Sequence, residues 1–101
     1  MRSRYAAYAL GLVDYILQTT DPHGPMWEPD EAGWRASVLA FHARCQFPGV
    51  TILEAPTPVG DHGTVTFHAR LRSGGRDVGF TERSRFVRRD GCWLYVDGER
   101  Q

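Results

Sequence analysis

The stretch that decides the fold is residues 64–72, which read Thr-Val-Thr-Phe-His-Ala-Arg-Leu-Arg. Apolar and polar side chains alternate along it, so the apolar ones share one face of an extended chain: Val65, Phe67, Ala69 and Leu71. Glycine-containing turns flank the stretch at residues 60–63 and 73–75. We therefore predict a β-strand with one buried face, set between antiparallel neighbours.

Three further segments have strand character, at residues 50–55, 78–88 and 92–97. Asp90-Gly91, a pair that favours a tight hairpin turn, separates the last two. Consecutive strands joined by short turns pair antiparallel, so the second half of the chain predicts a four-stranded meander. The side chains expected in its core are Val65, Phe67, Phe80 and Phe86.

The first half of the chain has helical spacing instead. Residues 3–19 carry an apolar stripe, and residues 30–45 carry another behind Asp30, a residue type that caps helices. Gly11 falls inside the first helix, where glycine is disfavoured, so we expect another element to approach it closely. Helices followed by an antiparallel meander indicate an α+β fold with two N-terminal helices, built as one domain over residues 1–101.

Composition argues against several classes of protein. Hydrophobic residues make up 42% of the 101 positions, a normal share for a single globular domain. Twelve arginines balance twelve acidic residues, and zero net charge argues against binding nucleic acid or a membrane through bulk charge. No apolar run reaches the ~20 residues that span a bilayer, and no signal peptide is visible. We expect a cytoplasmic protein that makes no membrane contact.

The cysteines and histidines form no recognisable metal or cofactor motif. Cys45 and Cys92 are isolated, and no two of the four histidines have the spacing of a ligand pair. Glycine-rich nucleotide loops and the nucleophile-elbow motif are absent as well. We predict no bound metal, no cofactor and two reduced thiols.

The long segment 78–88 carries two polar side chains on an apolar face. Glu82 and Ser84 are in phase with Phe80 and Phe86, so all four should point inward. A buried carboxylate needs a partner or a polar cavity, because an unpaired buried charge is unfavourable. Glu82 is thus either a structural carboxylate or part of a ligand cavity, with aromatic residues of the helices as walls. The candidate cavity residues are Glu82, Ser84, Tyr8, Tyr15 and Trp34.

The opposite face of the predicted sheet is rich in arginine. Arg83 and Arg85 share it with Arg70 and Arg72 of the neighbouring strand. A nucleic-acid-binding surface would place such side chains on phosphates. Because the net charge is zero, we favour a solvated face balanced by nearby acids, although the same residues would suit an interaction module.

Several strings resemble the YchJ-like central domain: Met1-Arg2-Ser3-Arg4-Tyr5-Ala6-Ala7-Tyr8, Gly33-Trp34, Gly63-Thr64-Val65, Glu82-Arg83-Ser84-Arg85-Phe86-Val87 and Asp90-Gly91-Cys92-Trp93-Leu94-Tyr95-Val96-Asp97-Gly98. The resemblance covers nearly the whole chain. It implies a fold similar to nuclear transport factor 2, in which helices and a curved sheet enclose a cavity, and a homodimer formed through the sheet.

Two features common in that family have no counterpart here. The cysteine-rich SEC-C zinc motifs that often flank the domain are missing, so no zinc role carries over. Thr19-Thr20-Asp21 stands where members often have a Trp-His pair after the first helix. The resemblance implies no assigned activity.

Three functional hypotheses stay open. The first is a small-ligand-binding or accessory domain that uses the cavity around Glu82. The second is a nucleic-acid or protein interaction module that uses the arginine face. The third is an enzyme of the dehydratase or isomerase type with Glu82 as base, which rests on analogy of fold alone. We also expect Arg2 or Arg4 to neutralise Glu82 or another buried acid, because the two most family-like strings contain these arginines and Glu82 and should meet in space.

Overall fold

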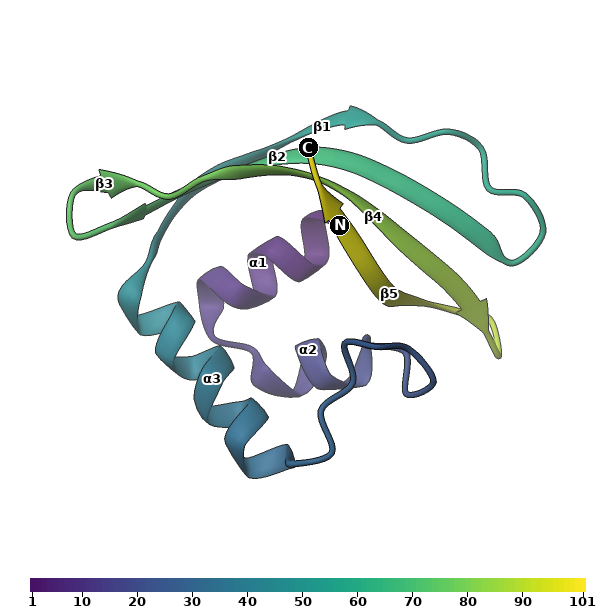
Figure 1. Ribbon diagram of the computed structural model, residues 1–101, viewed down its shortest axis with the longest axis horizontal. Coiled ribbons are helices and arrows are strands. Elements are labelled where there is room, and N and C mark those ends of the chain that lie inside the picture. Colours follow the sequence, from purple (N-terminus) through teal and green to yellow (C-terminus); the bar gives the residue numbers. More distant parts are fainter.

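The computed structural model describes residues 1–101 and shows helices beneath a curved antiparallel sheet (Figure 1). The helices are α1 (Arg2–Leu10), α2 (Val13–Gln18) and α3 (Glu31–Arg44). The strands are β1 (Gln46–Glu54), β2 (His62–Ser73), β3 (Arg76–Asp77), β4 (Phe80–Arg89) and β5 (Cys92–Arg100). The sheet order is β1-β2-β4-β5, with the short β3 attached to β2 and every pair antiparallel. The predicted α+β meander is confirmed.

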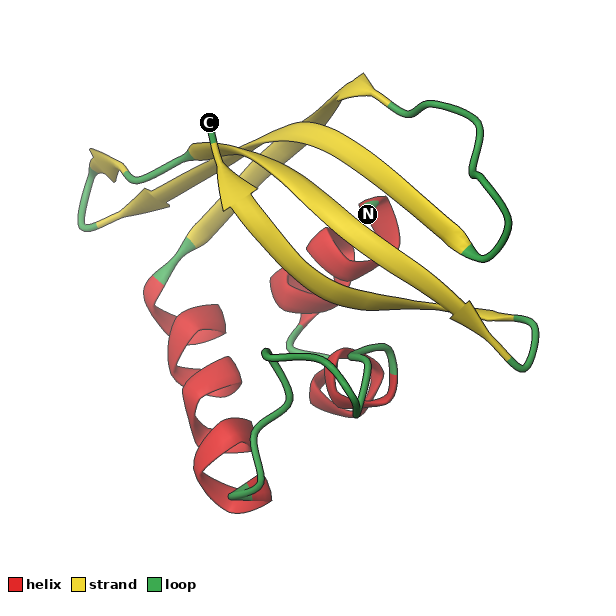
Figure 2. Ribbon diagram, turned by 45° about the vertical axis from the view of Figure 1, so that its right-hand side comes forward, coloured by secondary structure: helices red, strands yellow, loops and turns green.

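All three helices lie on the concave side of the sheet (Figure 2). Their shared apolar cluster consists of Ala7, Ile16, Leu17 and Val38. Of the four predicted core residues on the sheet, only Phe67 is fully buried, while Val65, Phe80 and Phe86 are half-buried. The latter three border cavities, although Phe80 and Phe86 also make edge-to-face contacts with Phe67 and Tyr95. None of the three helices is long and apolar enough to cross a membrane.

The expected helix 3–19 is two helices, because the chain reverses at Gly11. This residue has φ +70°, a left-handed conformation that glycine adopts without strain. The amides of Gly11 and Leu12 donate to the carbonyls of Tyr8 and Ala7, which is the hydrogen-bond pattern of a Schellman helix end. The close approach expected at Gly11 is confirmed, because a Cβ there would lie 3.1 Å from the His42 ring.

Strand β1 begins four residues earlier than predicted and runs through Pro48 and Gly49. Proline is tolerated because β1 is an edge strand, where one row of amides has no ladder partner. The Tyr5 hydroxyl fills the irregular register at this point. It accepts from the Gly49 amide at 2.7 Å and donates to the Arg70 carbonyl at 2.8 Å, so α1 is fixed directly to the sheet.

Candidate functional site

A cavity of about 370 Å³ lies between the helices and the concave face of the sheet. Thirteen of its 17 lining residues are hydrophobic, so most of its wall suits an apolar molecule. The aromatic part of the wall comes from both layers of the fold and comprises Tyr5, Tyr8, Trp34, Phe41, Phe47, Phe67, Phe80 and Tyr95. The charged side chains in the lining are Arg4, Glu82 and Arg100.

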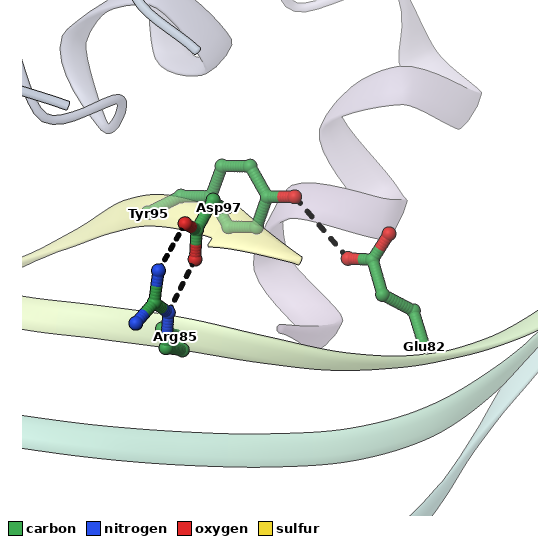
Figure 3. Close-up of polar contacts among 4 residues, drawn as sticks. All are labelled: Glu82, Arg85, Tyr95 and Asp97. Atoms are coloured by element: carbon green, nitrogen blue, oxygen red, sulfur yellow. Dashed lines mark hydrogen bonds and ion pairs between the residues drawn. The ribbon is translucent and has the colours of Figure 1, made fainter. Parts of the chain in front are cut away.

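Glu82 forms the polar centre of this cavity. The residue is only 9% exposed, and its carboxylate accepts from the Ser84 hydroxyl at 2.6 Å and from the Tyr95 hydroxyl at 3.2 Å, both at Oε2. Figure 3 shows the Tyr95 ring aimed at Glu82 across the β4–β5 pair. The other oxygen, Oε1, lies 3.5 Å from Nε of Arg100. Oε2 therefore accepts two hydrogen bonds, while Oε1 has only the ion-pair contact.

Strand alternation explains how Glu82 reaches this position. Its cross-strand neighbours are Phe67 on β2 and Arg100 on β5, and all three face the helices. Gly98 stands opposite Ser84, and a Cβ at Gly98 would overlap the Glu82 carboxyl group. The missing side chain of Gly98 therefore makes the space that the carboxylate occupies.

Arg4 is a second buried polar group in the wall and comes from the first turn of α1. It is 6% exposed, and its Nη1 donates to Ile16 O at 3.3 Å, Thr19 Oγ1 at 2.7 Å and Thr20 Oγ1 at 3.4 Å. Its guanidinium lies over the Tyr95 ring, 4.6 Å from the centroid. Burial lowers the pKa of the Arg4 guanidinium, and the Tyr8 and Tyr95 phenols beside it oppose that shift.

The expected ion pair between Arg2 or Arg4 and Glu82 is not formed. Arg100 makes the ion pair with Glu82 instead, and Arg4 makes none. Arg4 and Glu82 are linked only through Tyr95, whose ring stacks on Arg4 and whose hydroxyl donates to Glu82. Arg100 was missed because the predicted strand ended at residue 97, whereas β5 continues to Arg100.

Burial raises the pKa of both phenols at this site. For Tyr95, the nearby Glu82 carboxylate adds to the effect of burial, because it disfavours a second negative charge. For Tyr8, burial raises the pKa, and the Arg4 guanidinium partly opposes the shift. Both hydroxyls are therefore neutral near neutral pH, and the Tyr95 hydroxyl donates to Glu82.

The structure brings together three of the five predicted cavity residues. Tyr8, Trp34 and Glu82 line the same cavity. Ser84 is completely buried behind Glu82 and supports it without facing the cavity. Tyr15 lies elsewhere: its hydroxyl donates to Ser3 Oγ at 2.7 Å, and its ring borders a second cavity of about 660 Å³. The break at Gly11 accounts for this, because it gives α2 its own direction.

Tyr95 was missed because of a β-bulge. Between the pairs Arg85–Asp97 and Phe86–Tyr95 the register shifts by one residue, and Val96 is the extra residue on β5. Strict alternation from Gly98 and Arg100 would turn Tyr95 to the convex face, whereas the bulge returns it to the concave face. No local signal in the sequence marks this bulge.

The four arginines of the predicted basic face are exposed and lie among acidic and hydroxyl groups. Arg85 pairs with Asp97 through two hydrogen bonds (Figure 3). Asp97 raises the pKa of the Arg85 guanidinium, and Arg85 lowers the pKa of the Asp97 carboxyl. Arg70 donates to Thr51, while Arg72 and Arg83 stand opposite Asp77 and Glu99 in the strand registers. The positive charge of this face is therefore interleaved with negative charge.

No group of three or more His, Cys, Asp or Glu side chains is arranged to hold a metal ion. Cys45 is half-buried and Cys92 is exposed, and both are free thiols. The described site is thus built from a carboxylate, two guanidinium groups, hydroxyls and aromatic rings.

Solved structures with the same arrangement include two SEC-C motif containing proteins. The one from Rhodopseudomonas palustris is 38% identical, with a TM-score of 0.82, over 98% of this chain and 73% of that one. The one from Psychrobacter arcticus is 22% identical, with a TM-score of 0.73, over 96% of this chain and 56% of that one.

Like the one from Psychrobacter arcticus, a third solved structure shares the fold. It is a putative calcium/calmodulin dependent protein kinase II association domain from Xanthomonas campestris, 16% identical, with a TM-score of 0.61, over 95% of this chain and 77% of that one. The family model described as "YchJ, middle NTF2-like domain" matches residues 1–98. The chain therefore belongs to the family of YchJ middle NTF2-like domains.

Proposed function

We propose that this domain binds a small, mainly apolar molecule in the cavity between its helices and the concave sheet face. The observation that carries the proposal is the make-up of the cavity wall: 13 hydrophobic residues of 17, with a compact polar group around Glu82. Apolar walls with a few converging polar groups are typical of small-molecule sites. The volume of about 370 Å³ is within the range of such sites, roughly 300–1,000 Å³.

Large apolar side chains around the cavity are left only partly covered in the free protein. Only 13 of the 101 residues are buried, and large side chains such as Phe80 and Trp34 are half-buried against the cavity. A ligand would cover this apolar surface, at a gain of roughly 25 cal/mol per Å² removed from water. Removal of this apolar surface from water therefore favours binding of an apolar ligand.

The alternative of an enzyme with Glu82 as base has less support from the geometry. A base needs an oxygen free to take a proton from the substrate. Oε2 of Glu82 already accepts from Ser84 and Tyr95, which leaves only Oε1, 3.5 Å from Nε of Arg100, for that role. The arginine face gives little support to an interaction module, because Arg85 is paired with Asp97, and Arg72 and Arg83 stand opposite acids.

Ser37 offers a test of binding, because it is an exposed residue of α3 that lines the cavity. Ser37→Trp should fill the entrance, whereas Ala36→Trp, on an exposed position of the same helix outside the cavity, is the matched control. A fragment library screened by ligand-observed NMR should give hits that bind wild type and Ala36→Trp but not Ser37→Trp. Equal binding by all three proteins, or no hit for wild type, would overturn the proposal.

A further inference from the structure

Arg4 is a buried cation without an acidic partner. It is 6% exposed, and no carboxylate lies within 4.0 Å of its guanidinium. Buried arginines are normally paired, because burying an isolated charge is strongly unfavourable. The carboxylate that shares the cavity, Glu82, is already paired with Arg100. The charged side chains of the lining thus leave one positive charge uncompensated.

The neighbours of Arg4 compensate this charge only in part. Its three hydrogen bonds all leave from Nη1 and go to neutral oxygens of α2 and the residues after it, Ile16, Thr19 and Thr20. The Tyr95 ring contributes its negative face. Nε and Nη2 donate none of these three hydrogen bonds, and the neutral Tyr8 phenol is the other polar group beside the guanidinium. A guanidinium with free adjacent N–H groups is suited to bidentate binding of a carboxylate.

We propose that the ligand of this cavity is a monocarboxylate with an apolar body, and that its carboxylate binds Arg4. The inference rests on the proposed function, since it names the chemical class of the molecule held there. The apolar body lies against rings such as Phe67 and Phe80, and Tyr8 lies beside the carboxylate, while the Tyr95 hydroxyl stays bonded to Glu82. A cationic ligand fits less well, because Arg4 would repel it and Arg100 already pairs with Glu82.

Matched pairs of probes test this inference on the unaltered protein. Hexanoate, octanoate, 3-phenylpropanoate and 4-phenylbutanoate are compared with their carboxamides by calorimetry and by ¹⁵N NMR titration. Each pair keeps the apolar body and changes only the charge. Within each pair that binds, we expect the dissociation constant of the carboxylate to be at least about tenfold lower than that of the carboxamide. This is the typical gain when a hydrogen bond involves a charged group. We also expect the Arg4 Nε–H resonance to shift with carboxylates and not with carboxamides.

Two variants locate the charge that recognises the probe. Arg4→Gln should remove the preference for the carboxylate, whereas Arg100→Gln should retain it. Arg4→Lys is the conservative partner should Arg4→Gln fail to fold, and it should retain part of the preference. If only Arg100→Gln loses the preference for the carboxylate, the anion binds Arg100 and not Arg4, and the inference is wrong.

The failure of this inference can be distinguished from failure of the proposed function. If carboxylates and carboxamides bind equally, and Ser37→Trp abolishes both, the cavity binds ligands without selecting an anion and only the inference is wrong. If no probe of either kind binds, both proposals are wrong.

Discussion

The Tyr95 hydroxyl donates to Oε2 of Glu82 across 3.2 Å, while the Tyr95 ring carries the Arg4 guanidinium on its face. One side chain of β5 therefore links the carboxylate of β4 to the first turn of α1. The buried polar groups of the cavity form one network that spans both layers of the fold. Changes to any member are expected to affect its neighbours, because such groups are not independent.

The first prediction concerns the charge of Glu82. Glu82→Gln should lower the free energy of unfolding by about 1 kcal/mol or less, because Arg100 is largely exposed and the ion pair is screened. Glu82→Leu should cost more, about 1–3 kcal/mol, since it leaves the Ser84 and Tyr95 hydroxyls without their acceptor. Urea denaturation measures both values.

Glu99→Gln is the matched control for Glu82, because Glu99 is an exposed acid on the same strand pair, opposite Arg83. Its effect should stay within about 0.5 kcal/mol, as for ordinary surface changes. Equal stability of wild type and Glu82→Leu would show that the polar network contributes nothing to the fold.

The second prediction concerns Gly98, whose missing side chain makes room for Glu82. In Gly98→Ala the new methyl group overlaps the Glu82 carboxyl group, so the carboxylate must leave its partners Ser84 and Tyr95. We expect a loss of roughly 1–3 kcal/mol, from overpacking and from lost hydrogen bonds. In the Glu82→Ala background the same change should cost much less, because the displaced carboxylate is gone. A double-mutant cycle measures this coupling.

Gly63→Ala is the control for Gly98→Ala. Gly63 also lies in a strand of the sheet, but a Cβ there would meet its nearest neighbours at an ordinary distance of 3.6 Å. It should therefore have little effect on stability. Additive effects of Gly98→Ala and Glu82→Ala would contradict the steric explanation.

The inward position of Glu82 and Ser84 could be predicted from the sequence, and it is confirmed by their burial. A period of two is a strong signal when Phe80 and Phe86 fix which face is inside. The partners of Glu82 could not be predicted, because they depend on long-range register. Tyr95 faces the cavity through a bulge, and Arg100 reaches it through an extension of β5 beyond the apolar pattern.

The path of the helices could also be predicted only in part. Gly11 predicted a close approach by another element, but neither the left-handed helix end nor the identity of the neighbour, His42, which is distant in sequence, could be predicted. The direction of α2, and with it the position of Tyr15, depends on that conformation. The turn Asp90-Gly91 was predictable because both residues adopt positive φ in a two-residue hairpin, and both do so here.

The third prediction concerns the turn at Gly11. Gly11→Ala should lower the free energy of unfolding by about 1–2 kcal/mol from the left-handed backbone, and further from contact with the His42 ring. Gly60→Ala is the matched control, because Gly60 also has positive φ but a Cβ there meets nothing within 4 Å. The difference between the two variants isolates the His42 contact. Equal losses in both would show that the ring moves aside freely.

The last prediction is a pH dependence set by Asp21, a 3% exposed residue whose carboxylate accepts from Arg89 at 3.1 Å and 3.3 Å. The hydrogen bonds from Arg89 hold the pKa of Asp21 below its ordinary value. The unfolded chain therefore binds a proton more readily than the folded one. The resulting stabilisation is present above about pH 4 and is lost as pH falls through the lower folded-state pKa. Urea midpoints measured from pH 2 to 6 should fall less steeply in Asp21→Asn and Arg89→Gln than in wild type. Parallel curves for the three proteins would show that this pair does not contribute to acid sensitivity.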